Sequence, residues 1–158
     1  MRILVSTLVL ILVHTTAHAH CEIPCGIYDD ELRIELIKEH IGTIEKSIMM
    51  IGELNKVDDK DYNQIVRWVM NKEDHANKIQ EIVYQYFLNQ RIKPVDESDQ
   101  AALNKYHHEL TLLHHMLVYS MKSKQSLSTD NTDMLKSLVD DFSQSYFGKD
   151  KMMEKHHH

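Results

Sequence analysis

The chain has 158 residues, a formal net charge of −6 and two cysteines. Its length suits one ordinary domain. The acidic balance, without any basic run, argues against a nucleic-acid partner. After the N-terminal stretch no segment is long and apolar enough to cross a bilayer, so we expect a soluble mature protein without stable membrane contact.

Residues 1–19 have the pattern of an export signal. Met1 and Arg2 form a short positive start, residues 3–13 are apolar, and Ala17-His18-Ala19 is a small-x-small cleavage site. We expect signal peptidase to cut after Ala19, which makes His20 the first residue of the mature chain. This predicts an exported protein, periplasmic or extracellular.

Residues 20–28 contain both cysteines and form a candidate metal-binding hook. Cleavage creates an α-amine on His20, beside its imidazole and the thiol of Cys21, with Cys25 four positions further on. In an exported protein two cysteines also suggest a disulfide, but a bridge closing so small a loop would contribute little stability. A metal held by both thiolates is at least as good an account. Pro24 and Gly26 indicate a sharply turned hook backbone.

Four amphipathic helices are predicted after Tyr28, over residues 30–54, 61–93 and 99–122 and over a last helix that ends at Gly148. Short polar connections favour an all-α, up-down four-helix bundle over residues 29–148, followed by a flexible tail at 149–158. The apolar stripes predict the core. They comprise Ile37, Ile41, Ile44, Ile48 and Ile51; Ile65, Val69, Ala76, Ile79, Val83 and Tyr86, widened by Val66, Trp68, Ile82 and Phe87; Leu103, Tyr106, Leu110, Leu113, Leu117 and Met121; and Leu135, Leu138, Val139, Phe142 and Tyr146.

Other candidate metal sites are weaker. A dimetal bundle needs Glu-x-x-His pairs on facing helices, and only Glu154 with His157, in the tail, has that spacing. The doublets His107-His108 and His114-His115 are about 10 Å apart along a helix, too far to share one ion. We therefore interpret them as solvated or interfacial histidines.

The hook has the chemistry of a square-planar metal centre. A terminal amine, the next amide nitrogen and two thiolates give two nitrogens and two sulfurs in small chelate rings. This arrangement suits Ni(II) or Cu(II), whereas Zn(II) prefers a tetrahedron. Such electron-rich donors lower a Ni(III)/Ni(II) potential, and the His20 imidazole can reach the axial position.

His20, Cys21, Pro24, Cys25, Gly26 and Tyr28 together resemble the nickel hook of nickel-containing superoxide dismutase. Arg33-Ile34-Glu35 is similar to an Arg-Ile-Glu run on the first helix of that family. The resemblance implies one nickel ion per subunit, bound by the His20 amine, the Cys21 amide and the Cys21 and Cys25 thiolates. It also implies a homohexamer of bundles that buries the hook between subunits, with Met49-Met50 and Leu112 as candidate contact positions.

The same resemblance assigns roles to residues around the metal. Tyr28 is expected at the mouth of the site, Glu35 on the other nitrogen of the His20 imidazole, and Tyr86, before Phe87, as a second pocket tyrosine. Two positions depart from the family pattern. Glu22 stands where Asp is expected, and His75 lies near the position of an arginine that supports the His–Glu pair.

The function implied is disproportionation of superoxide to dioxygen and hydrogen peroxide through a Ni(III)/Ni(II) cycle, with His20 and Tyr28 as catalytic residues. One alternative is a non-catalytic nickel- or copper-binding or delivery protein that uses the same hook and needs neither Glu35 nor Tyr28. Another is a structural bundle with a terminal disulfide. Superoxide decay and thiol titration separate the three.

Overall fold

The computed structural model describes residues 28–148. The chain forms helices α2 (Asp30–Leu54), α3 (Tyr62–Glu81), α4 (Gln100–Gln125) and α5 (Asp130–Phe147), and α3 continues into a π-helix, η1 (Ile82–Arg91). The predicted all-α four-helix bundle is confirmed. The predicted signal peptide, the hook before Tyr28 and the tail lie outside the described residues. Among the described residues, no helix has the length and apolar character needed to span a membrane.

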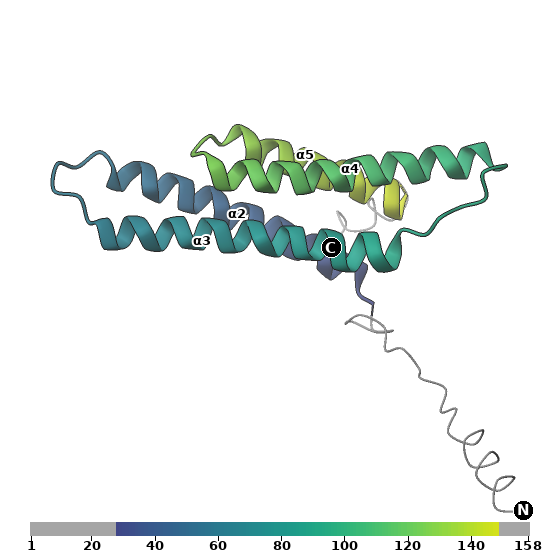
Figure 1. Cartoon of the computed structure of the whole chain (residues 1–158), viewed down its shortest axis with the longest axis horizontal. Coiled ribbons are helices and arrows are strands. Elements are labelled where there is room, and N and C mark those ends of the chain that lie inside the picture. Colours follow the sequence, from purple (N-terminus) through teal and green to yellow (C-terminus); the bar gives the residue numbers. More distant parts are fainter. Residues whose placement is uncertain (1–27, 149–158) are drawn as a thin grey trace, which may run out of the picture.

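Successive helices run in opposite directions and form two hairpins that pack on each other (Figure 1). One hairpin is α2 with α3, the other α4 with α5. The start of α2, the η1 segment and the end of α5 therefore meet at one end of the bundle. The start of α2 follows the predicted hook in the sequence, so the contacts at this end hold the point where the predicted hook joins the bundle.

Aspartate side chains fix three of the helix starts. Asp29 accepts a hydrogen bond from the Leu32 amide at 3.0 Å, and Asp61 accepts one from the Gln64 amide at 3.0 Å. Asp99 accepts from the first amides of α4. Each cap satisfies amides that have no partner inside the helix, which typically stabilises a helix by about 1 kcal/mol. The predicted start of α2 at residue 30 and of α3 near Asp61 follow from these caps.

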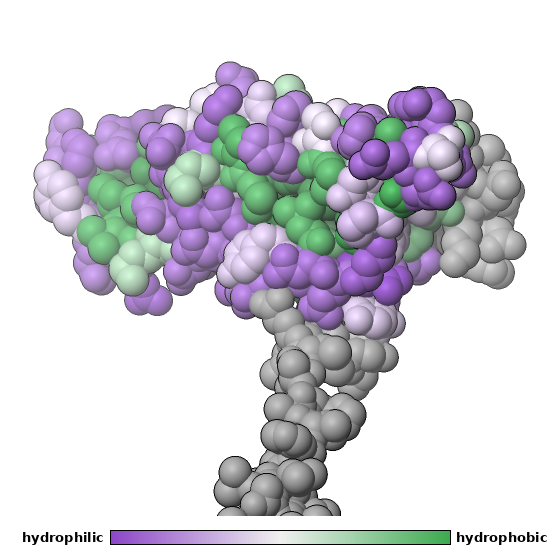
Figure 2. Space-filling model, turned by 45° about the vertical axis from the view of Figure 1, so that its right-hand side comes forward, coloured by the Kyte–Doolittle hydropathy of each residue, from purple (hydrophilic) through white to green (hydrophobic). Residues whose placement is uncertain are grey.

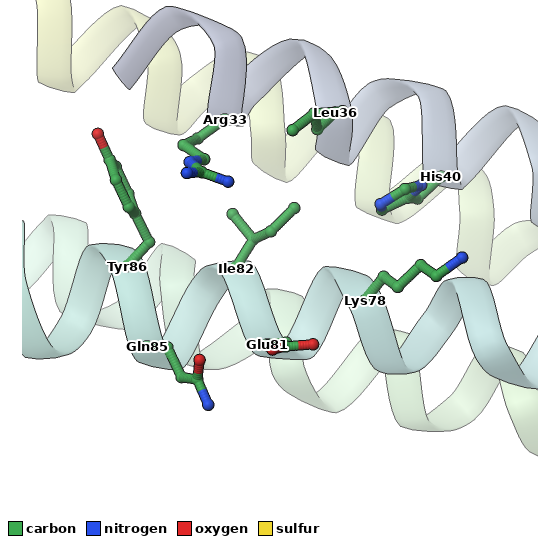
Figure 3. A pocket seen from close by; sticks show the side chains of 8 residues that line it. All are labelled: Arg33, Leu36, His40, Lys78, Glu81, Ile82, Gln85 and Tyr86. Atoms are coloured by element: carbon green, nitrogen blue, oxygen red, sulfur yellow. The ribbon is translucent and has the colours of Figure 1, made fainter. Parts of the chain in front are cut away.

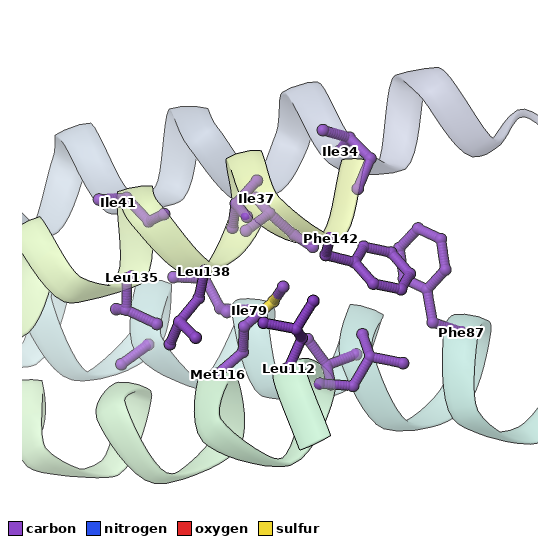
Figure 4. Close-up of a cluster of buried hydrophobic side chains, with 14 of the residues drawn as sticks. Ile34, Ile37, Ile41, Ile79, Phe87, Leu112, Met116, Leu135, Leu138 and Phe142 are labelled. Carbon is purple, nitrogen blue, oxygen red and sulfur yellow. The ribbon is translucent and has the colours of Figure 1, made fainter. Parts of the chain in front are cut away.

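The core lies between the two hairpins and is built mostly from aliphatic side chains with two phenylalanines (Figure 4). Ile37, Ile41 and Ile44 of α2 are fully buried, as are Phe87 and Phe142. Burying one such side chain stabilises the fold by about 1.5–3 kcal/mol. The buried set comprises Ile34, Ile37, Ile41, Ile44, Ile48, Ala76, Ile79, Val83, Tyr86, Phe87, Ile92, Leu112, Leu113, Met116, Leu135, Leu138, Val139 and Phe142.

Three sequence predictions about burial are wrong. Val66 and Met121 were expected inside but are 55% and 44% exposed, whereas Leu112, expected at a subunit contact, is buried at 7%. On α4 the core face runs through Leu112, Leu113 and Met116 and continues through small polar serines, so the stripe is shifted from the predicted one. Figure 2 shows hydrophobic side chains that remain exposed among hydrophilic ones on one face of the bundle.

The C-terminal part of the second predicted helix is a π-helix rather than an α-helix. The amide of Ile92 donates to the carbonyl of Phe87 at 2.9 Å, a five-residue hydrogen bond. Such widened turns frequently occur at functional sites, because the extra residue re-aims the side chains that follow. Tyr86 and Arg91 lie in this segment and face the start of α2.

Candidate functional site

Tyr28 and Tyr86 lie side by side, although 58 positions separate them in the sequence. Their ring centroids are 6.0 Å apart in an edge-to-face arrangement, a favourable geometry for aromatic pairs. The Arg91 guanidinium lies 4.4 Å from the Tyr28 ring centroid. Tyr28 is 44% exposed and Tyr86 only 2%. The structure thus holds one tyrosine at the surface against one that is buried.

Asp30 connects the helices that meet at this end of the bundle. Its carboxylate accepts hydrogen bonds from the Tyr86 hydroxyl at 2.5 Å and the Tyr146 hydroxyl at 2.8 Å. It also forms an ion pair with Arg91, whose Nη2 lies 2.7 Å away. The Asp30 carboxylate therefore links η1 and α5 to the first turn of α2, two residues after Tyr28.

These contacts change the acidities of the groups involved. Burial alone raises the pKa of the Asp30 carboxyl, but hydrogen bonds from Arg91, Tyr86 and Tyr146 outweigh burial and lower it. Burial, and then the Asp30 carboxylate, raise the pKa of Tyr86 to about 12 and that of Tyr146 to about 12. Both phenols therefore stay protonated at neutral pH and keep donating to Asp30.

A groove of about 320 Å³ runs between α2 and the α3–η1 segment (Figure 3). Arg33 lies in it, with its guanidinium 4.9 Å from the Tyr86 ring centroid. The Arg33 Nε atom is buried and has no hydrogen-bond partner among the described residues. At the other end of the groove are His40 and Lys78. The groove thus leads from Tyr86 past Arg33 to Lys78, two cationic side chains.

The other predicted site residues lie apart from the tyrosine pair. Glu35 is exposed, and because it is two residues after Arg33 it lies about 200° around the helix from that side chain. His75 contacts His40, with their Nδ1 atoms 3.1 Å apart, instead of pointing to Glu35. Within this single chain, Glu35 and Tyr86 are not brought together. His20, Cys21, Glu22, Pro24, Cys25 and Gly26 lie outside the described residues.

Sequence reasoning missed Asp30, Arg91 and Tyr146. Asp30 read as an ordinary acidic residue at a helix start, and nothing in its neighbourhood pointed to Arg91, 61 positions further on. Tyr146 was interpreted as a core residue of the last helix. Only the fold brings the three together. The one sequence feature that could have drawn attention to this site was Arg91, a charged residue close to the predicted end of the second helix.

The fold and this site define a class: an all-α four-helix bundle whose N-terminal segment of metal-ligand residues leads into an aromatic, ion-paired helix end. A comparison with family models matches residues 15–151 to the nickel-containing superoxide dismutases. The chain belongs to this family. It is a nickel-dependent oxidoreductase that disproportionates superoxide to dioxygen and hydrogen peroxide. Comparisons with curated proteins and with solved structures found no match.

The donor groups of the chain fit the nickel ion that this family requires. Both cysteines of the protein, and a histidine directly before the first of them, lie within the matched residues. Thiolate and nitrogen donors in a planar set suit nickel, whereas the described residues contain no cluster of three or more side chains able to hold a metal. Both thiols of the chain lie in the segment before Tyr28, outside the described residues.

Proposed function

We propose that His20, Cys21 and Cys25 hold the nickel ion. The donors would be the His20 α-amine, the Cys21 amide nitrogen and the two thiolates, and the His20 imidazole would be a further ligand. The observation that carries this proposal is the His20-Cys21-x-x-Pro24-Cys25 sequence inside the family match. When bound, nickel supplies the one-electron Ni(III)/Ni(II) couple that alternately oxidises and reduces superoxide.

The residues of the chain position this segment and control access to it. Tyr28 is the last residue of the hook, and its contacts with Tyr86 and Arg91 anchor the point where the hook joins the bundle. We assign Tyr28 the entrance, where its exposed phenol orders water and limits which anions approach. Tyr86 supports Tyr28 from beneath, because its own hydroxyl is engaged by Asp30.

Glu35 is assigned the other nitrogen of the His20 imidazole, which would fix the orientation of the ring. Glu35 is exposed in the single chain and so is free of the core. If Glu35 has this role, Glu35→Gln should reduce activity while leaving nickel content close to that of the unmodified enzyme. Equal activity in Glu35→Gln and unmodified enzyme would contradict the assignment.

The proposed ligands are tested by the rate of superoxide decay in purified, nickel-loaded mature protein. Cys21→Ser and Cys25→Ser should each abolish the activity and the nickel content, because each removes a thiolate donor. Tyr84→Phe, at an exposed tyrosine of η1, is a matched control that should keep both. Activity that survives Cys21→Ser would exclude the proposed site.

We further propose that the mature enzyme is a homohexamer, as the family resemblance implies. Tyr28 and Met49 are 44% and 58% exposed in the single chain, which leaves both available for contacts between copies. Leu112 is withdrawn from such a role because it is buried. Sedimentation equilibrium should give about six times the mass of the mature chain, and a monomeric mass would refute the hexamer.

Export is proposed from the leader pattern of residues 1–19 and the Ala17-His18-Ala19 site. Signal peptidase then acts as the maturation enzyme, and superoxide is removed outside the cytoplasm. Fractionation of cells that produce the full chain should recover the mature protein in the periplasm or the medium. Mature protein confined to the cytoplasm would contradict the proposed localisation.

A further inference from the structure

Two histidines face each other across the contact between α2 and α3. His40 and His75 direct their Nδ1 atoms toward one another at 3.1 Å, and their ring centroids are 4.9 Å apart at an interplanar angle of 79°. Both side chains are half-buried. His40 also lines the groove that Figure 3 shows, so the pair has access to solvent.

The spacing of the two nitrogens suits a shared metal ion. Histidine nitrogens bind Zn²⁺ at about 2.0–2.1 Å. An ion at that distance from both Nδ1 atoms would therefore have a nitrogen–metal–nitrogen angle of about 100°. This angle lies between those of octahedral and tetrahedral coordination. A direct hydrogen bond is also possible at 3.1 Å, with one ring donating and the other accepting. The 3.1 Å distance between the two Nδ1 atoms is thus compatible either with a shared proton in a hydrogen bond or with a shared metal ion.

The surroundings keep both rings in the form that binds metals. Burial, and then the charge of the other ring, lower the pKa of His40. Burial, and then the Lys78 ammonium, lower the pKa of His75. Neutral imidazole is the ligand form of histidine, so protons compete weakly for this pair at neutral pH.

The charged groups around the pair are mixed. Lys78 opposes a bound cation, whereas the carboxylates of Glu39 and Asp74 favour one. All three side chains are exposed. Since no cluster of three metal-binding side chains occurs in the described part of the chain, water must complete the coordination. Such a site is open and exchanges its ion readily.

We propose that His40 and His75 form a second, two-histidine site for a divalent first-row transition-metal ion that prefers imidazole, such as Zn²⁺ or Ni²⁺. The site joins α2 to α3 at the end of the groove away from Tyr86. It is independent of the hook, because it uses no residue before Tyr28. An ion bound there stabilises the folded protein without taking part in the reaction.

The experiment uses the mature chain without its other strong ligands. His20→Ser, Cys21→Ser and Cys25→Ser remove the metal-binding side chains of the hook, and His156→Ser, His157→Ser and His158→Ser remove the terminal histidines. Titration with Zn²⁺ at neutral pH should show one ion per chain. His40→Gln and His75→Gln should each weaken this binding at least about tenfold, whereas His114→Gln, at an exposed histidine of α4, should not change it.

Two further measurements protect the result from a folding defect. Imidazole nitrogen resonances of His40 and His75 should shift on addition of Zn²⁺ in the background protein, which needs no histidine substitution. The melting temperature should rise with Zn²⁺ in that background and in His114→Gln, but not in His40→Gln. Unshifted resonances, or equal Zn²⁺ affinity after His40→Gln and His75→Gln, would show that the pair is only a hydrogen bond and overturn the proposal.

Discussion

At the scale of single residues, Asp30 is the side chain on which the site end of the bundle depends most. It is the only carboxylate among the described residues that accepts from both Tyr86 and Tyr146, and it pairs with Arg91 as well. Its side chain is 15% exposed, so water replaces these partners poorly. Hydrogen bonds to a charged group in such surroundings contribute about 1.5–3 kcal/mol each, before the cost of burial is deducted.

Asp30→Asn should therefore lower the free energy of unfolding by about 2–3 kcal/mol, because it leaves the Arg91 charge without its counter-ion. It should also lower the pKa of Tyr86 from about 12 toward the ordinary 10.0, since one cause of the shift is removed and burial remains. Urea unfolding and ultraviolet titration of the tyrosines measure the two effects.

Asp141→Asn, at an exposed aspartate of α5, provides the control and should change stability by less than about 0.5 kcal/mol. The contribution of Asp30 also has a defined pH range. Because its folded pKa is lowered, the stability it provides is present above its ordinary pKa of 3.8 and is lost as pH falls through the folded value. Matching acid unfolding of Asp30→Asn and the unmodified protein would contradict this role.

At the scale of helices, the sequence predicts what is local and misses what is not. The bounds of α2 follow from a repeated isoleucine stripe with an aspartate cap, and the structure has the same residues 30–54. The π-helical turn of η1 is invisible to a 3.6-residue period, because five-residue hydrogen bonds do not alter which residues are apolar. The partners of Asp30 lie 56, 61 and 116 positions away, so only tertiary packing reveals them.

Lys72 is a second case that only packing reveals. Its ammonium reaches from α3 to the C-terminal end of α4 and donates to the carbonyls of Ser123, Lys124 and Ser126 at 2.7, 2.6 and 3.1 Å. The residue is 3% exposed, and burial lowers the pKa of the ammonium. A cation at the negative end of a helix satisfies carbonyls that have no partner inside the helix.

Lys72→Met should thus destabilise the protein by about 2–3 kcal/mol, because three carbonyls lose a charged donor while the aliphatic volume is largely kept. Chemical denaturation followed by circular dichroism measures the change. Lys46→Met, at an exposed lysine of α2, should stay within about 0.5 kcal/mol of the unmodified protein. An equal effect of both substitutions would show that Lys72 does not support α4.

The contact between α2 and α3 should weaken in mild acid. Because the folded pKa values of His40 and His75 are lowered, the unfolded chain binds more protons than the folded one below the ordinary value of 6.5. Stability is therefore full above this pH and falls as pH drops from about 6.5 through the folded values. Protonating both rings also places two positive charges side by side.

The double variant His40→Gln, His75→Gln should flatten this pH dependence. Thermal unfolding measured in steps from neutral to mildly acidic pH, without added metal, gives the two curves. The melting temperature of the unmodified protein should fall more steeply than that of the variant in this range. The same slope in the double variant and in His114→Gln would assign the acid sensitivity to other groups.

At the scale of the whole molecule, the bundle acts as a support for one end of the chain. The start of α2, the η1 segment and the end of α5 meet where the hook joins α2, and the Asp30 network and the Tyr28–Tyr86 contact lie at this same end of the bundle (Figure 1). If nickel is bound by the first residues of the chain, its ligands depend on which residue the mature chain begins with. In the proposed ligand set, the α-amine donor would exist only after a protease had exposed His20, so maturation would be a step in assembling the proposed site.

One extra residue before His20 should therefore abolish nickel binding and activity, although the fold is unchanged. The substitution of an amide for the amine removes a strong donor, and the displaced backbone can no longer close the same chelate ring. Mature protein beginning at His20 and a variant with Ala retained before it are loaded with nickel in parallel. Metal content, superoxide decay and helicity by circular dichroism are then compared.

The variant should show equal helicity, because the described residues 28–148 do not include the altered end. It should retain little nickel, and its superoxide decay should match that of the Cys21→Ser protein. This pairing separates two explanations: a defect in folding would lower helicity, whereas loss of the amine lowers only metal content and rate. Full activity with the extra residue in place would mean that the His20 amine is not a ligand, and the hook would then need a different set of donors.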